Sequence, residues 1–310
     1  MTDRAKPQAR HGLKNKNGDS IITDIVIYVI FTLFTLLCVF PFYYIFINTI
    51  SNNQLVTRGQ IMFWPVGVHL GNYREVLKLN GLAQAAFISV ARTVLGTGLT
   101  LLGTMFLGYA MSRQEYWHHK FWYRFVVITM YFNAGLIPWF INMKNLGLLN
   151  NFLAYILPGM VSPFYMILYK TYVESIPASL EESAQLDGAG YLVRFFRIIF
   201  PLSMAMLATI AVFTAVAQWN SFTDTLFLMT GSKMYTLQFL LYQYLSEADS
   251  VAALIRSNPA MVSTMDMSNT LTATSVRMTI TVVVVLPVLC VYPFFQRFFI
   301  KGIMIGAVKG

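Results

Sequence analysis

The chain has 310 residues, of which 56% are hydrophobic and only 11% are charged, and its mean hydropathy is +0.59. Soluble domains carry about 25% charged residues, so this composition excludes an ordinary soluble protein and predicts an integral membrane protein. The net charge of +9 does not indicate nucleic-acid binding, because the basic residues flank long apolar runs and form no single stripe.

The amino-terminal segment, residues 1–20, is polar and basic. The apolar run that follows is long, and no small-residue cleavage site interrupts it, so a secretory signal peptide is not indicated. The sequence therefore predicts a disordered cytoplasmic tail over residues 1–20 and one transmembrane domain over residues 21–310.

Six runs along the rest of the chain are apolar and nearly uncharged. A helix needs about 20 such residues to cross roughly 30 Å of hydrocarbon, so the predicted fold class is all-α with six transmembrane helices. A further run, Met234–Ser246, lacks charge but is short, and we interpret it as an interfacial or cavity-lining segment outside the membrane. The predicted spans lie at about residues 25–49, 90–112, 123–143, 152–171, 198–222 and 276–298.

The distribution of Lys and Arg predicts the side of the membrane on which each loop lies. With six spans and an inside N-terminus, the inside segments hold 14 Lys and Arg residues and the outside segments hold seven. Cytoplasmic loops of membrane proteins carry such an excess. Both termini are therefore predicted to be cytoplasmic.

The inside loop at residues 174–197 is long, and a long connection indicates a function. Pro177 suits the first turn of a helix, with Ser175 as its expected cap. Glu181 and Glu182 follow near the positive N-terminal end of that helix. Gly188 can take the left-handed conformation that ends a helix. The loop is thus predicted to be a short surface helix followed by a sharp turn, a shape suited to a partner's groove.

The spacing of this loop resembles the EAA loop of permease subunits in type I ATP-binding-cassette (ABC) importers. That pattern is Glu-Ala-Ala, three residues, Gly, nine residues, Ile, one residue and Leu-Pro; here Ser replaces the first Ala and Phe replaces Leu. Residues 133–138, 146–150 and 157–159 resemble the carbohydrate and oligosaccharide branch of the same family. The matching positions of the loop are Glu182, Ser183, Ala184, Gly188, Ile198, Phe200 and Pro201.

The resemblance implies a permease domain that works with other chains in the plasma membrane of a prokaryote. It implies a second permease subunit, expected to form a heterodimer with this one, two copies of a cytoplasmic ATPase, an extracytoplasmic solute-binding protein and surrounding lipid. ATP and Mg are expected in the ATPase, since this chain has no G-x-x-x-x-G-K-[ST] phosphate loop.

The same resemblance implies a transport subunit and not an enzyme. Movement of residues 177–190 by the ATPase is expected to switch the spans between inward-open and outward-open states, which is transport by alternating access. The residues implied to couple to the ATPase are Glu181, Glu182, Ser183, Ala184, Asp187, Gly188 and Ala189.

The substrate pathway is expected to use polar and aromatic residues near the outer halves of the spans, because sugars bind to aromatic faces and hydrogen-bonding groups in cavities. Two alternatives stand beside this interpretation. Asn side chains in spans commonly bond to neighbouring helices, and Trp residues commonly lie in the interfacial belt. The candidates are Asn48, Asn133, Trp139, Gln218, Trp219 and Asn220.

The sequence predicts no catalytic, cofactor-binding or metal-binding site. Cys38 and Cys290 lie inside apolar runs without a C-x-x-C pattern, so we expect two small buried residues. His118 and His119 lack an H-E-x-x-H pattern and are expected to be solvated. Arg92 lies near the outer end of a span and is expected to extend to water, although an intramembrane charge is also a functional candidate.

Other functions stay open at this point. A permease of the same family for phosphate, an amino acid or a polyamine would share the loop, but the carbohydrate-like third and fourth spans disfavour it. A membrane-embedded enzyme or a stand-alone ion-coupled transporter needs ionisable or nucleophilic groups that face a cavity. The predicted spans carry almost no Asp, Glu or His, which disfavours both.

Overall fold

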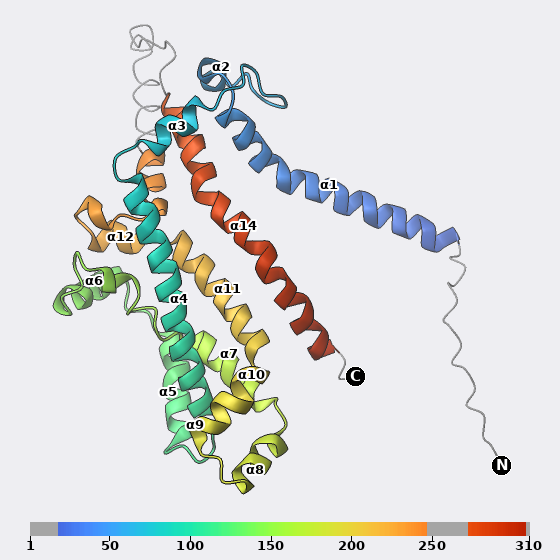
Figure 1. The fold of residues 1–310 in the computed structure, drawn as a ribbon, viewed down its shortest axis with the longest axis vertical. Helices are drawn as coiled ribbons and strands as arrows, with labels where there is room; N and C mark the ends of the chain where they lie inside the picture. Colours follow the sequence, from blue (N-terminus) through green and yellow to red (C-terminus); the bar gives the residue numbers. More distant parts are fainter. Residues whose placement is uncertain (1–17, 247–271, 308–310) are drawn as a thin grey trace.

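The computed structural model describes residues 18–246 and 272–307. These residues contain helices and no strand, in agreement with the predicted all-α class. The predicted tail falls mainly on residues 1–17, which lie outside the described residues. The helices form an elongated bundle from which the first helix stands apart (Figure 1).

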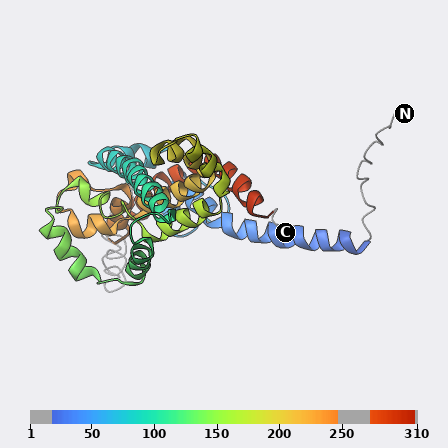
Figure 2. The ribbon, with the colours of Figure 1, turned by 90° about the horizontal axis from the view of Figure 1, so that it is seen from below.

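That first helix, α1 (Gly18–Thr49), extends away from the rest of the chain over most of its length (Figures 1 and 2). None of the residues in its most apolar window is buried against this chain. Cys38 on α1 and Cys290 on α14 (Ala273–Ala307) are both exposed, so the expectation that they are buried is wrong. The reason is that both helices present apolar faces that this chain does not cover, and such faces need lipid or another polypeptide beside them.

Two short helices, α2 (Asn53–Thr57) and α3 (Gly71–Leu77), lie at one end of the bundle (Figure 1). The buried side chain of Asn72 joins them to the end of α1. Its Nδ2 donates to the carbonyl oxygen of Thr49 at 2.8 Å and to Oδ1 of Asn53 at 2.9 Å. Because a buried amide is costly without partners, these bonds fix the position of the segment.

The centre of the bundle is α4 (Leu82–Ser112), which packs against α7 (Pro163–Glu174) and α11 (Met204–Asn220). The sequence of α4 is rich in Leu and Ala and contains no proline, so the helix continues unbroken. It runs from the end of the bundle near α3 to the opposite end (Figure 1). Glycines on α4 allow its neighbours to approach closely.

Gly103 is the closest of these approaches. A Cβ atom at this position would lie 2.5 Å from the carbonyl oxygen of Met160, a backbone atom that cannot rotate away. We therefore expect Gly103→Ala to lower the free energy of unfolding by about 1–3 kcal/mol. Thermal melting of the purified protein in detergent measures this loss.

Gly98→Ala is the matched control on the same helix. Within the described part of the chain, no atom lies within 4 Å of the position its Cβ would take. Because alanine is the better helix former, Gly98→Ala is expected to leave stability unchanged or to raise it by up to about 1 kcal/mol. Equal melting temperatures for the two variants would contradict the close approach at Gly103.

The predicted third span is broken into α5 (His119–Tyr131) and α6 (Leu136–Asn145), which meet at an angle of 117°. Phe132 is extended, and Gly135 has a φ of +87°, a value that glycine adopts without strain. These two residues end one helix and redirect the chain into the next. The break places α6 beside the bundle (Figure 1).

The predicted fifth span is also bent. The consecutive helices α9 (Tyr191–Arg194), η2 (Phe195–Ile199) and α10 (Phe200–Leu202) form one segment, which meets α11 at 74°. Ser203 lies at the bend, and its hydroxyl is 2.8 Å from the hydroxyl of Tyr169 in α7. The turn η2 is π-helical, a form that is rare and frequently found at functional sites.

Three described helices, α1, α4 and α14, are long and apolar enough to cross a membrane, and five spans result if each bent pair counts as one. The predicted span at residues 152–171 holds instead the short turn η1 (Phe152–Tyr155) and the 12-residue helix α7. Pro163 begins α7, since proline suits the first helical turn. The described chain thus supports three to five spans, and six spans with both termini cytoplasmic stay a prediction.

The segment after α11 folds back over the bundle as α12 (Thr223–Leu228), η3 (Ser232–Met234) and helical residues 237–246. Leu237 and Leu241 pack against side chains of α3, α4 and α14. The interfacial placement of this segment stays a prediction.

Candidate functional site

The helix α8 (Ala178–Leu186) is the tip of the bundle, at the end opposite α2 and α3 (Figure 1). Its N-cap is Pro177, whose backbone is extended with φ −55° and ψ 123°. The expectation that Ser175 caps this helix is wrong. Ser175 instead ends α7, and its hydroxyl donates to the carbonyl oxygen of Tyr172 at 2.7 Å.

The predicted helix stop at Gly188 is confirmed. Gly188 has a φ of +82°, and its N–H donates to the carbonyl oxygen of Gln185 at 3.0 Å. The next N–H, of Ala189, donates to the carbonyl oxygen of Ala184 at 2.9 Å. These two bonds form a Schellman motif, which ends α8 and turns the chain toward α9.

Glu181 differs from the other residues predicted to couple to the ATPase. Only 5% of Glu181 is exposed, whereas the rest are exposed or half-buried on the surface of α8 and its turn. Leu186, the last residue of α8, is 90% exposed. Single exposed apolar residues are common on protein surfaces, so Leu186 indicates a contact with another protein only together with the rest of the exposed helix α8. The exposed or half-buried set is Glu182, Ser183, Ala184, Asp187, Gly188 and Ala189.

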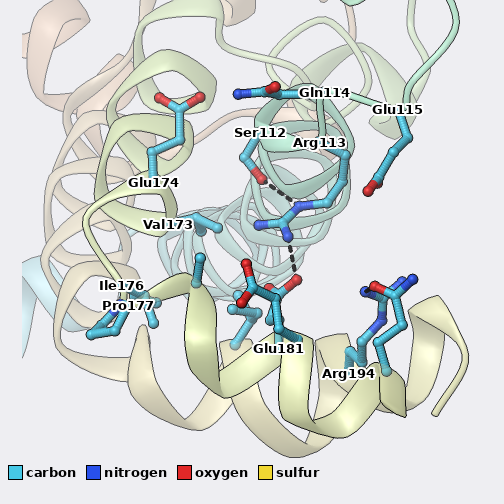
Figure 3. A pocket seen from close by; sticks show the side chains of 14 residues that line it. Ser112, Arg113, Gln114, Glu115, Val173, Glu174, Ile176, Pro177, Glu181 and Arg194 are labelled. Carbon is cyan, nitrogen blue, oxygen red and sulfur yellow. Dashed lines mark hydrogen bonds and ion pairs between the residues drawn. The ribbon is translucent and has the colours of Figure 1, made fainter. Parts of the chain in front are cut away.

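A polar pocket of about 520 Å³ lies between α8 and the ends of α4 and α7. Figure 3 shows Glu181 pointing from α8 toward the guanidinium of Arg113, at the end of α4. The two side chains form an ion pair. Nε of Arg113 also donates to the hydroxyl of Ser112 at 3.1 Å, and its guanidinium carbon lies 4.7 Å from the ring centre of Tyr109.

A second arginine holds the other side of the pocket. Arg194 in α9 is 5% exposed, and its Nη1 donates to Oε1 of Gln185 in α8 at 3.0 Å. Its guanidinium carbon lies 4.4 Å from the ring centre of Tyr191. Among the described residues, Oε1 of Glu181 and Nε of Arg194 have no hydrogen-bond partner. Both residues line the pocket.

An open cavity of about 580 Å³, called here the inner cavity because it lies farther along α4 from the tip α8, lies among α4, α6, η1, α11 and α12. Three of the six predicted substrate-pathway residues, Asn133, Trp139 and Gln218, line it together. Tyr155 adds a second aromatic ring. Aromatic faces with a few polar groups in one cavity form the kind of site that binds a small organic solute.

Arg92 also lines this cavity, and the expectation that it extends to water is wrong, since only 3% of it is exposed. Its guanidinium pairs with Asp224 in α12. Nε donates to Oε1 of Gln218 at 2.9 Å and Nη1 to the carbonyl oxygen of Ser221 at 3.3 Å. The guanidinium carbon lies 4.7 Å from the ring centre of Tyr155. These nearby acceptors replace water as partners of the charge.

The other three predicted pathway residues lie outside the lining of the inner cavity. Asn48 is buried, and its Nδ2 donates to the carbonyl oxygen of Tyr44 within α1 at 2.8 Å. Nε1 of Trp219 donates to the carbonyl oxygen of Val284 in α14 at 3.0 Å. Asn220 is exposed at the end of α11.

The sequence analysis did not single out Asp224 or Tyr155. Asp224 is the acidic partner of Arg92. The sequence signal that could have identified it is that the two residues carry opposite charges beside runs that are otherwise uncharged. The hydroxyl of Tyr155 lies 3.0 Å from that of Thr225 and donates to the carbonyl oxygen of Met234 at 2.6 Å. No group of three or more His, Cys, Asp or Glu residues in the described part of the chain is placed to hold a metal ion.

Comparison with known proteins decides the family, although no family model matches the chain. The polygalacturonan/rhamnogalacturonan transport system permease protein YtcP of Bacillus subtilis is 33% identical over 287 residues, which cover 93% of this chain and 98% of that protein. The chain belongs to the permeases of sugar and oligosaccharide ABC transport systems. The lactose transport system permease protein LacG of Rhizobium radiobacter is 27% identical over 291 residues, which cover 93% of this chain and 97% of that protein.

A solved structure supports the same ABC permease assignment. It is described as the crystal structure of a bacterial ABC transporter involved in the import of the acidic polysaccharide alginate. One of its chains matches this chain with a TM-score of 0.80 and 30% identity, over 93% of this chain and 100% of that one. The ABC permease assignment makes this chain a transport subunit, not an enzyme, and a multi-pass protein of a prokaryotic cell membrane.

Proposed function

We propose that the chain is one permease subunit of an ATP-driven importer that moves a sugar or oligosaccharide by alternating access. The loop at residues 174–197 couples it to a separate ATPase. The observation that carries this proposal is α8 itself, an exposed helix with a leucine at its tip, ended by a fixed turn and placed at the end of the bundle opposite α2 and α3. ATP and Mg bind the partner, and this chain needs no cofactor of its own.

The proposed assembly contains a second permease, two copies of the ATPase and an extracytoplasmic solute-binding protein. The exposed apolar faces of α1 support the second permease, because a helix that its own chain leaves uncovered gains packing contacts from a neighbouring subunit. In the inner cavity, Asn133, Trp139 and Gln218 are the residues proposed to meet the sugar. Among the described residues that line that cavity, Asp224 is the one carboxylate, and its ion pair with Arg92 disfavours an ion-driven transporter.

A pull-down of tagged protein from its native membrane with mass spectrometry tests the proposal. Wild type is expected to recover an ATPase and a second permease. Gly188→Pro is expected to lose the ATPase, because proline cannot adopt a φ of +82° and removes the N–H that bonds to Gln185.

Gly190→Pro is the matched control for that experiment. Gly190 lies two residues away in the same turn, and its φ of −70° is one that proline adopts. This variant is expected to keep the ATPase. Wild type without any ATPase, under conditions in which other importers stay whole, would overturn the proposed function.

Two of the three relatives described above favour an acidic oligosaccharide as the substrate, whereas LacG is named for lactose, a neutral sugar. YtcP is named for galacturonans, and the alginate importer is described as acting on an acidic polysaccharide. We expect unlabelled oligogalacturonate to compete with uptake of labelled trigalacturonate in cells that carry the importer, and neutral maltotriose not to compete. Uptake of labelled maltotriose without uptake of labelled trigalacturonate would assign a neutral sugar instead.

A further inference from the structure

We propose that Arg113 and Glu181 are the positioning pair that carries movement of α8 to α4, and through α4 to the inner cavity. The inference rests on the proposed function, because it concerns how the coupling loop acts on the transport pathway. Neither residue is assigned to touch the transported solute.

The helix α8 is held to the body of the permease by a buried side chain. This helix is described over its full length and buries one residue, Glu181. Leu186 at its tip is 90% exposed. The chain enters α8 through the extended residue Pro177 and leaves it through the Gly188 turn. Glu181 is therefore the buried side chain by which α8 is held to the end of α4, beside the bond from Arg194 of α9 to Gln185.

Arg113 is fixed to the end of α4 by contacts with two residues of that helix. Its Nε bonds to the hydroxyl of Ser112, and its guanidinium lies over the ring of Tyr109, both on α4. Only 7% of the Glu181 side chain and 21% of the Arg113 side chain are exposed. Separating a buried pair leaves a charge without compensation, so the two side chains are expected to move together.

The helix α4 is long enough to reach from Arg113 to the inner cavity. Arg92 and Arg113 lie on this unbroken helix, about 30 Å apart at 1.5 Å per residue. Arg92 contacts Gln218 of α11 and Asp224 of α12 at the inner cavity. The continuous helix α4 thus carries Arg92 about a third of the way along and Arg113 at its end, and each arginine pairs with a carboxylate on a different helix. Rigid helices with such contacts are a physical route for coupling between distant sites.

A weaker contact runs parallel to this route. The hydroxyl of Tyr191 in α9 donates to Oε2 of Glu115, just after α4, at 3.3 Å, and both residues are exposed. Exposed polar contacts of this kind contribute little. The buried pair of Arg113 and Glu181 is therefore the principal connection.

The experiment measures whether nucleotide bound to the ATPase changes access to the inner cavity. Cys38 and Cys290 are exposed and are first replaced by serine. Phe227→Cys then places a thiol at the cavity lining. The complete assembly is reconstituted in liposomes, and labelling of the thiol by a membrane-impermeant maleimide is followed with and without ATP and vanadate, beside the rate of ATP hydrolysis.

In this background, ATP and vanadate are expected to change the labelling rate by about fivefold or more. Arg113→Gln and Glu181→Gln are each expected to reduce that change to less than about twofold while ATP hydrolysis continues. The double exchange Arg113→Glu with Glu181→Arg restores opposite charges and is expected to restore the response. Glu75→Gln is the control, because Glu75 of α3 pairs at 2.8 Å with Lys78, which directly follows α3, at the opposite end of the bundle from α8, and this pair joins no two helices.

An unchanged labelling response in Arg113→Gln would overturn the inference alone. A second pattern would also overturn it: both single variants lose ATP hydrolysis and the labelling response in proportion, and the double exchange restores neither. That pattern indicates damage to folding. If the cysteine-replaced protein with intact Arg113 and Glu181 bound no ATPase, the proposed function itself would be contradicted.

Discussion

Asp224→Ala is expected to lower the free energy of unfolding by about 3–5 kcal/mol, the largest loss we expect from a single substitution in this chain. The reason is that Arg92 is 3% exposed, so its positive charge is left buried without a carboxylate. Gln218 and Ser221 still offer acceptors, but neither carries a charge. Thermal and denaturant-induced unfolding in detergent measures the loss.

The opposite substitution supplies a sharp comparison. Arg92→Met is expected to cost less, about 1–3 kcal/mol, because 24% of the Asp224 side chain is exposed and water can reach its carboxylate. The double variant, Arg92→Met with Asp224→Ala, removes both charges and is expected to be more stable than Asp224→Ala alone. Additive losses in the double variant would show that the pair does not stabilise the fold as a unit.

Leu186→Asp is expected to weaken binding of the ATPase by about tenfold or more without lowering the melting temperature. Because Leu186 is 90% exposed, the fold of this chain gains nothing from its side chain. An aspartate placed in an apolar groove loses its hydration without a partner. Pull-down yield from membranes and melting of the purified chain are the two measurements.

Leu186→Met is the matched variant for this test, since methionine keeps an apolar side chain of similar volume. It is expected to bind the ATPase nearly as well as wild type. If Leu186→Asp and wild type recovered the ATPase equally, the tip of α8 would not be part of the docking surface, and the contact would have to lie elsewhere on the loop.

The loop could be predicted from the sequence because its structure is local. Gly188 ends α8 through bonds to Gln185 and, at the next residue, to Ala184, all within six positions of the chain. The turn depends on the ability of glycine to adopt a positive φ, and the glycine can be read directly from the sequence. The cap was missed because Ser175 is drawn into the end of α7 and Pro177 takes its place.

The inner cavity could be predicted only in part, since its residues come together from distant parts of the chain. Arg92 and Asp224 are 132 positions apart, and nothing in the local pattern pairs them. Trp139 and Gln218 were identified by residue type alone, and the same criterion also selected Trp219, which turns to α14. Polarity identifies candidates, but tertiary packing decides which of them face one space.

The isolation of α1 has a consequence for the evolution of this chain. Its residues from 21 to 42 make so few contacts within the chain that selection on them comes from whatever lies against them, lipid or a neighbouring subunit. Where that neighbour is the proposed second permease and a separate gene encodes it, we expect changes on α1 to be compensated by changes in that gene. A hybrid chain that takes α1 from a relative would then fold as well as either parent. It would pack poorly against the neighbouring subunit until that subunit is also replaced by the relative's.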